Sequence, residues 1–137
     1  AASDVYKRQS DIYIAGVDDV STKMDDAKSV AAQVSSKDFV IFLAHNPSVI
    51  SSSLLLTDRN GRGNWFDLGL FGHTHGGQVP FLEEAINFNG VPSRYESGLL
   101  LENRSWLLIS RGVGTTGLPA RLFCQPEIHL ITVQSGT

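Results

Sequence analysis

The chain has 137 residues, of which 42% are hydrophobic and 18% charged, which suits one ordinary globular domain and is too short for two. The formal net charge is −3 and no cluster of lysine and arginine is visible, so the composition does not favour nucleic-acid binding. The longest apolar run, residues 39–44, is far shorter than the roughly 20 residues of a membrane-spanning helix, and we expect a soluble protein. The single cysteine, Cys124, excludes an internal disulfide and has the apolar neighbours of a buried side chain.

The first nine residues differ in character from the rest of the chain. Residues 1–9, AASDVYKRQ, follow neither the helical nor the strand period of apolar residues. They resemble the translated adaptor sequence that contaminates sequence assemblies, and we interpret them as a non-native segment. Residues 10–137 are then expected to be part of a larger domain.

The first native elements are a strand and a helix. Residues 11–17, DIYIAGV, are rich in β-branched and aromatic residues, which predicts a strand. A helix capped by Ser21 or Thr22 is expected next, because apolar residues follow at helical spacing: Met24, Ala27, Val30, Ala31 and Val34. The nearby acidic residues are interpreted as solvated or capping rather than as metal ligands: Asp18, Asp19, Asp25 and Asp26.

The middle of the chain alternates strands and helices. Residues 39–45, FVIFLAH, are almost continuously apolar, which predicts a strand covered on both faces with His45 at its carboxyl end. A helix is expected to begin at Pro47, and the polar residues 57–64 form a surface loop. Residues 65–72, WFDLGLFG, predict the next strand. This strand leads directly to the stretch GHTHGGQ.

The last third is rich in strand signals. Residues 105–110, SWLLIS, and residues 127–133, EIHLITV, predict two strands, with the glycine-rich residues 111–119 between them. Strands separated by helices early and a strand-rich sequence late predict a mixed α/β layered domain, in which polar residues gather at strand ends.

His73 and His75 stand two positions apart among glycines, after an apolar strand. In an extended segment residues i and i+2 face the same way, about 6.5–7 Å apart, so both side chains can reach one metal centre. His45, at the end of another strand, can add a third imidazole. The alternative is a turn that contains histidines without binding a metal. His129 is interpreted as a residue on the polar face of its strand.

The stretch GVGTTG, residues 112–117, matches the dinucleotide-binding pattern G-x-G-x-x-G. Pro119 follows at once where a long helix should run, and no acidic residue follows at about 20 positions to hold a ribose. A tight loop is the better interpretation, and we expect no affinity for NAD or FAD.

GHTHGGQ, together with the upstream AHNP, resembles the calcineurin-like metallophosphoesterase superfamily. The residues from ISRGVGTTGLP to the carboxyl end, and IAGVDD near the start, resemble its bacterial YaeI/YkuE-like branch. The resemblance covers about residues 11–135. It implies a two-sheet β-sandwich flanked by helices, of which this chain is expected to hold the carboxyl-terminal half.

The resemblance also implies the chemistry. In that family two divalent ions, manganese, zinc or iron, share a bridging carboxylate and a bridging hydroxide that attacks phosphorus. By motif, His45 and His73 would ligate one metal and His75 the other. The family motifs D-x-H, G-D-x-x-D and G-N-H-[DE], which supply the remaining ligands and the general acid, are absent from this chain.

Two functions follow as hypotheses. The first is a metal-dependent phosphoesterase whose missing amino-terminal half completes the site, so that this chain alone is inactive and holds no catalytic acid. The second is a non-catalytic domain that binds one zinc through three histidines. For the first, the resemblance implies a phosphoester substrate, either a small molecule or a lipid-linked pyrophosphate, and a cytoplasmic or membrane-peripheral location for the full protein.

Overall fold

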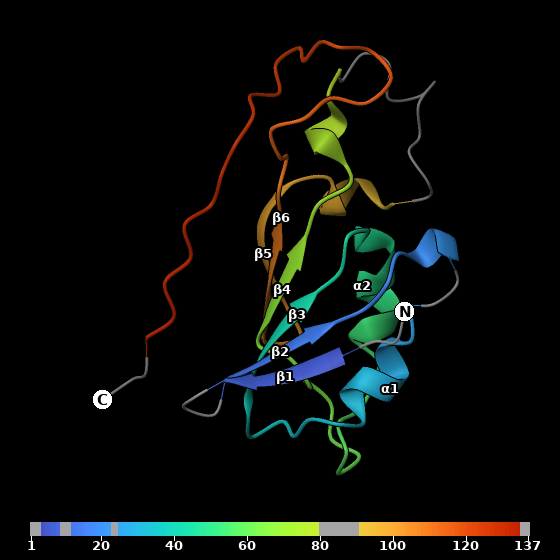
Figure 1. Cartoon of the computed structure of the whole chain (residues 1–137), viewed down its shortest axis with the longest axis vertical. Helices are drawn as coiled ribbons and strands as arrows, with labels where there is room; N and C mark the ends of the chain where they lie inside the picture. The colour runs from blue at the N-terminus through green and yellow to red at the C-terminus, as the bar shows by residue number, and fades with distance from the viewer. Residues whose placement is uncertain (1–3, 9–11, 23–24, 80–90, 135–137) are drawn as a thin grey trace.

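The computed structural model describes residues 4–8, 12–22, 25–79 and 91–134, and it contains one mixed six-stranded sheet (Figure 1). The strand order is β1-β2-β3-β4-β6-β5. The strands are β1 Asp4–Arg8, β2 Ile12–Gly16, β3 Phe39–Leu43, β4 Leu68–Phe71, β5 Gly98–Glu102 and β6 Ser105–Ile109. The predicted mixed α/β class is confirmed. Among the described residues there is this one sheet, and the second sheet of the expected sandwich is not among them.

The four central strands are parallel and the two edge strands are antiparallel. β2, β3, β4 and β6 run in one direction, while β1 pairs antiparallel with β2 and β5 with β6. The carboxyl ends of the parallel strands therefore meet at one edge of the sheet. Residues 4–8, which we interpreted as non-native, form β1 at the edge, and their origin stays a prediction.

The first helix, α1, is short and begins at a polar cap. α1, Ala27–Ala31, is capped by Asp26, whose carboxylate accepts the backbone N–H of Ser29 at 2.9 Å. The predicted cap at Ser21 or Thr22 is wrong, because residues 20–22 form a separate 3-10 turn and the carboxylate of Asp26 serves the later helix instead. Met24 lies outside the described residues.

The prediction that a helix begins at Pro47 is confirmed. The 3-10 turn Pro47–Val49 leads into α2, Ile50–Ser53, and the side chain of Asn46 accepts the N–H of Ser48 at 2.9 Å. Proline is favoured at the first helical position because it lacks the N–H that would go unpaired there. Two further 3-10 turns are His75–Gly77 and Ser93–Tyr95.

The core lies between the sheet and these helices. The ring of Phe42 in β3 packs against Trp65, Phe66 and Phe71, with centroids 4.9–6.0 Å apart. Gly69 in β4 makes this packing possible, because a Cβ there would lie 2.6 Å from the ring of Phe71. The aromatic cluster fixes the lateral position of β3 against β4.

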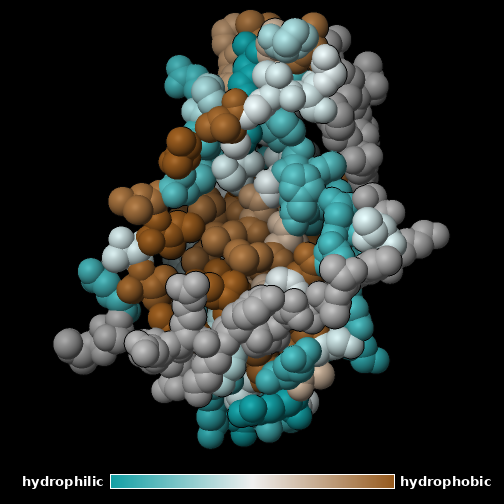
Figure 2. Space-filling model, viewed as in Figure 1, coloured by the Kyte–Doolittle hydropathy of each residue, from teal (hydrophilic) through white to brown (hydrophobic). Residues whose placement is uncertain are grey.

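The opposite face of the sheet is apolar and largely uncovered by the described residues. The alternate residues Ile41 and Leu43 of β3 point to this face, and Leu43 is 38% exposed, so the expectation of cover on both faces of β3 is wrong for the described structure. Figure 2 shows apolar residues gathered over the strands of Figure 1. The face is continuous across the sheet and consists of Ile12, Ile14, Phe39, Ile41, Leu43, Leu68, Leu70, Leu99, Leu101, Trp106 and Leu108.

Two elements differ from the sequence analysis. β5 was not predicted; it forms a hairpin with β6 through Asn103 and Arg104, both with positive φ. Residues 127–133 were predicted as a strand, but they pair with no strand among the described residues. Two hydrogen bonds hold Glu127: its N–H donates to the carbonyl of Gly112, and its carboxylate accepts the N–H of Arg111. Within the described ranges, no helix is long and apolar enough to cross a membrane.

Candidate metal centre

Two histidines lie side by side at the carboxyl edge of the sheet. β3 and β4 are adjacent and parallel, and His45 and His73 each follow the end of their strand by two residues. The N–H of Gly72 donates to the carbonyl of His45 at 3.0 Å, which continues the pairing beyond the strands. A Cβ on Gly72 would lie 3.9 Å from that carbonyl oxygen, which is an ordinary van der Waals contact. The strands that lead to His45 and His73 are therefore neighbours in the sheet, which brings these two candidate ligands together.

The two imidazoles direct nitrogen atoms at each other. Nδ1 of His73 lies 3.2 Å from Nε2 of His45, and the rings are 80° apart. Two nitrogens bound to one zinc at about 2.0–2.1 Å stand roughly 2.8–3.4 Å apart in octahedral or tetrahedral geometry. In this structure the two rings are joined by a hydrogen bond, and their nitrogen separation lies within the range found for two nitrogens on one divalent ion.

The electrostatics around His73 favour the neutral ring. Partial burial lowers the pKa of His73, and the nearby imidazoles of His45 and His75 lower it further, while the charge of Asp19 acts in the opposite direction. A neutral imidazole is the form that binds metals. Asp19, which we interpreted as purely structural, thus lies close enough to His73 to influence its charge.

The GHTHGG segment is a turn and not an extended strand. β4 ends at Phe71, Thr74 is helical, and both His73 and His75 have positive φ, +67° and +53°. The expectation that His73 and His75 face the same way in an extended segment is therefore wrong. The turn directs His73 toward His45 and directs His75 elsewhere.

His75 is directed to the glycine-rich loop. Its Nδ1 lies 3.2 Å from the carbonyl oxygen of Gly114, a common arrangement for metal-binding histidines, whose second ring nitrogen bonds a backbone carbonyl. No group of three or more potential metal-binding side chains occurs within the part of the chain that the structure describes. His45 and His73 thus form a pair, and His75 stands apart from it.

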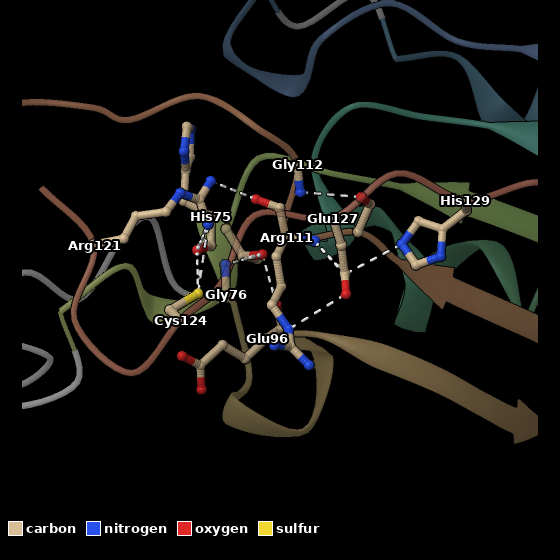
Figure 3. Close-up of polar contacts among 11 residues, drawn as sticks. His75, Gly76, Glu96, Arg111, Gly112, Arg121, Cys124, Glu127 and His129 are labelled. Carbon is tan, nitrogen blue, oxygen red and sulfur yellow. Dashed lines mark hydrogen bonds and ion pairs between the residues drawn. The ribbon is translucent and has the colours of Figure 1, made fainter. Parts of the chain in front are cut away.

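The other residues that the sequence analysis discussed have structural contacts. Cys124 is buried, as predicted, and its Sγ donates to the carbonyl of His75 at 3.0 Å. His129 does not lie on a strand; its Nε2 is 3.2 Å from the carboxylate of Glu127 (Figure 3). No helix follows residues 112–117 within the described structure, which confirms the loop interpretation, whereas the absence of dinucleotide binding stays a prediction.

Three residues that hold the site in place, Gln78, Arg121 and Gly114, were not predicted from the sequence. Gln78 bonds the glycine-rich loop through the carbonyls of Thr116 and Leu118, and Arg121 contacts the turn that holds His75. Gly114 supplies the carbonyl to His75. Their partners are 38 to 46 residues away in sequence, and the one signal was the joint presence of GHTHGGQ and the glycine-rich tail.

Known proteins with similar sequences match most of the length of this chain. No protein-family model and no solved structure matches the chain significantly. It is 34% identical over 89% of its length to "Uncharacterized protein YpbG" of Bacillus subtilis (strain 168), and 33% identical over 92% to "Uncharacterized metallophosphoesterase YkuE" of the same organism. It is 29% identical over 90% to an "Uncharacterized metallophosphoesterase" of Aquifex aeolicus (strain VF5).

The aligned part of each relative is a minority of its length. The chain spans 42% of each of the two Bacillus proteins and 46% of the Aquifex protein. Within that span lie His45, His73 and the turn between β4 and the glycine-rich loop. Over most of its own length the chain is therefore similar to two proteins that are named metallophosphoesterases, in agreement with the resemblance of the motifs AHNP and GHTHGGQ.

Proposed function

We propose that this chain carries one half of the metal centre of a metal-dependent phosphoesterase. The observation that carries the proposal is the 3.2 Å separation of the ring nitrogens of His45 and His73 at the ends of adjacent parallel strands. The relatives that are named metallophosphoesterases support the reaction class. His45 and His73 would hold one divalent ion and His75 the other.

The donor set fits divalent transition metals. All three candidate ligands are imidazoles, which suit zinc, iron and manganese. The lowered pKa of His73, which results first from burial of its ring, keeps that residue in the metal-binding form at neutral pH. The carbonyl of Gly114 orients the ring of His75, so its Nε2 is left for a ligand.

Each part of the chain would have a defined task in hydrolysis. A pair of divalent ions activates water and neutralises the phosphoryl oxygens when it is bound. The histidines of this chain would fix the ions at the carboxyl edge of the sheet, and the exposed ring of His45 leaves that edge open to substrate. We assign no general acid to this chain, and expect it in the part of the relatives that the chain does not span.

The substrate and its context are proposed only by class. We infer a phosphoester substrate, either a small phosphodiester or a lipid-linked pyrophosphate, in a cytoplasmic or membrane-peripheral setting. The composition supports neither nucleic acid as the ligand nor a membrane span within the described residues. The partner that completes the site is the remaining half of the same domain.

The test is hydrolysis of bis-p-nitrophenyl phosphate with manganese, zinc or iron. Residues 10–137 alone should show no turnover above background, because a general acid contributes about 10²–10⁴-fold and the bridging carboxylate is absent. A fusion with the remaining part of the Aquifex relative should turn over, lose activity with a chelator, and lose it on His75→Ala. His129→Ala in the same fusion is the matched control.

Three outcomes distinguish the hypotheses. Chelator-sensitive hydrolysis by residues 10–137 alone would show that the site is complete in this chain. A folded fusion that binds one zinc through the three histidines and hydrolyses nothing would favour the non-catalytic zinc-binding alternative. A fusion equally active with and without His75 would remove that residue from the site.

A further inference from the structure

The guanidinium of Arg121 donates to three backbone carbonyls, and Figure 3 shows it beside His75 and Arg111, which supply two of them. Its NH1 donates to the carbonyl of His75 at 3.2 Å and its NH2 to that of Arg111 at 2.8 Å. Its Nε donates to the carbonyl of Gly114 at 2.9 Å, and NH2 also contacts that oxygen. One planar side chain thus joins the histidine turn to two positions, Arg111 and Gly114, of the glycine-rich residues 111–119.

Two of these carbonyls determine the position of His75: one through its backbone and the other through its ring. The first belongs to His75 itself and also accepts Sγ–H of Cys124, so two side chains hold a residue whose φ is +53°. A β-substituted residue in this left-handed region persists only where its surroundings fix it. The second carbonyl, of Gly114, lies 3.2 Å from Nδ1 of the His75 ring.

The position of Gly114 depends on polar contacts and not on burial. Residues 113–120 are exposed throughout, so little apolar packing holds the loop. Gln78 fixes its far end, through Thr116 and Leu118. Arg121 fixes the end nearest to His75, because both its Nε and NH2 donate to Gly114.

The contact with Gly114 determines which nitrogen of His75 carries the proton. A carbonyl oxygen only accepts, so Nδ1 of His75 must be protonated for the contact to be a hydrogen bond. In the neutral ring the proton is then absent from Nε2, and its lone pair is free. Without the carbonyl, the ring would have no reason to keep this tautomer.

We propose that Arg121 is a positioning residue: by holding the carbonyls of His75 and Gly114 it fixes the turn and selects the Nδ1–H tautomer of His75, which leaves Nε2 free for a metal ion. The hydrogen bonds of Arg121 do not depend on the proposed function, but a role of Arg121 in catalysis rests on it. Lysine cannot replace this arginine, because one ammonium on a flexible stem does not reproduce a planar fork that reaches three acceptors.

The experiment is long-range ¹H–¹⁵N NMR of the histidine rings in the full 137-residue chain without metal. At about pH 8.5 an unperturbed imidazole with a pKa of about 6.5 is neutral, so each ring reports its tautomer. The wild type should show His75 predominantly as the Nδ1–H form. Arg121→Lys should convert His75 to a mixture or to the Nε2–H form, while Arg59→Lys, on an exposed loop, should change nothing.

Two results would overturn the proposal: a wild-type His75 that is mainly Nε2–H, or an unchanged tautomer in folded Arg121→Lys. If Arg121→Lys does not fold, exchange of the Arg121 Nε–H in the wild type decides instead; slow exchange supports the proposal and free exchange refutes it.

Zinc titration of the same variants separates this claim from the proposed function. In the fusion with the remaining part of the Aquifex relative, where His75 would hold the second ion, Arg121→Lys should weaken binding of that ion roughly 10–100-fold, as loss of an orienting partner typically does. The expected tautomers with no zinc binding in any variant would support the role of Arg121 and count against the metal centre. Unchanged zinc affinity together with an unchanged tautomer would refute the role of Arg121.

Discussion

At the scale of single residues, the site consists of strained backbone held by side-chain contacts. Both His73 and His75 have positive φ, a conformation that costs a non-glycine residue of order 1–3 kcal/mol. Thr74 between them is buried and its hydroxyl donates to the carbonyl of Glu96 at 2.6 Å. Such strain clusters at functional sites, which agrees with the proposed metal centre.

Gly76 gives the sharpest residue-scale prediction. Its φ is +61°, and a Cβ would lie 2.5 Å from Cγ of Arg111 and 2.8 Å from Sγ of Cys124. Gly76→Ala should therefore destabilise the chain by about 1–3 kcal/mol, measured by urea unfolding. Gly63→Ala is the matched control, because nothing lies within 4 Å of a Cβ there. Equal unfolding midpoints for the two variants would contradict the close approach.

The sequence allowed some site residues to be predicted and not others. His45 and His73 could be placed together, because parallel strands bring their carboxyl ends to one edge whatever the loops do. Arg121 and Gln78 could not, since their contacts depend on how two irregular segments meet, and no periodicity encodes that. The orientation of His75 was predicted wrongly because alternation holds only while the strand continues, and β4 ends at Phe71.

At the scale of elements, a buried carboxylate holds the loop of residues 57–64 against the segment before β3. Asp58 accepts the backbone N–H groups of Ser36, Asn60 and Arg62 at 2.7–2.8 Å. The N–H of Ser36 makes the largest contribution to holding the pKa of Asp58 well below its usual value; burial opposes the shift, and the N–H groups of Arg62 and Asn60 add to it. The carboxylate therefore links two loops at the amino-terminal edge of the sheet.

This lowered pKa predicts an acid dependence of stability. A group whose pKa is lower in the folded chain stabilises it above the unfolded pKa of about 3.9, and the stabilisation is lost as the pH falls toward the folded value. Asp58→Asn should be less stable than wild type at pH 7, and the difference should shrink below about pH 4. Urea midpoints at several pH values test this; a constant difference would show that the charge of Asp58 is not involved.

Some of the strands could be predicted from the sequence and others could not. β2, β3, β4 and β6 are apolar runs bounded by turn residues, and they could be predicted from the sequence. β5 was missed, because its hairpin turn uses Asn103 and Arg104 and not the more recognisable Asn-Gly. Residues 127–133 have a strand pattern, yet a strand needs a partner, and they pair with no strand among the described residues.

At the scale of the molecule, the uncovered apolar face of the sheet is the surface most prone to cause self-association. It is apolar across five strands, and Leu99, Leu101 and Trp106 on it are 58%, 56% and 48% exposed. Apolar patches of this kind promote association. Isolated 137-residue chains should therefore self-associate, and Leu99→Asp with Leu101→Asp should lower the sedimentation coefficient toward that of the monomer. Leu55→Asp, at an exposed residue off the sheet, is the control; a monomeric wild type at high concentration would contradict this prediction.

The central claim, that His45 and His73 bind a divalent ion, is tested most directly by calorimetric titration of zinc into the 137-residue chain. We expect saturable, weak binding of one ion by the wild type, a large loss of affinity on His73→Ala and on His45→Ala, and no change on His129→Ala. Equal zinc binding by the wild type and by the double variant His45→Ala, His73→Ala would contradict it.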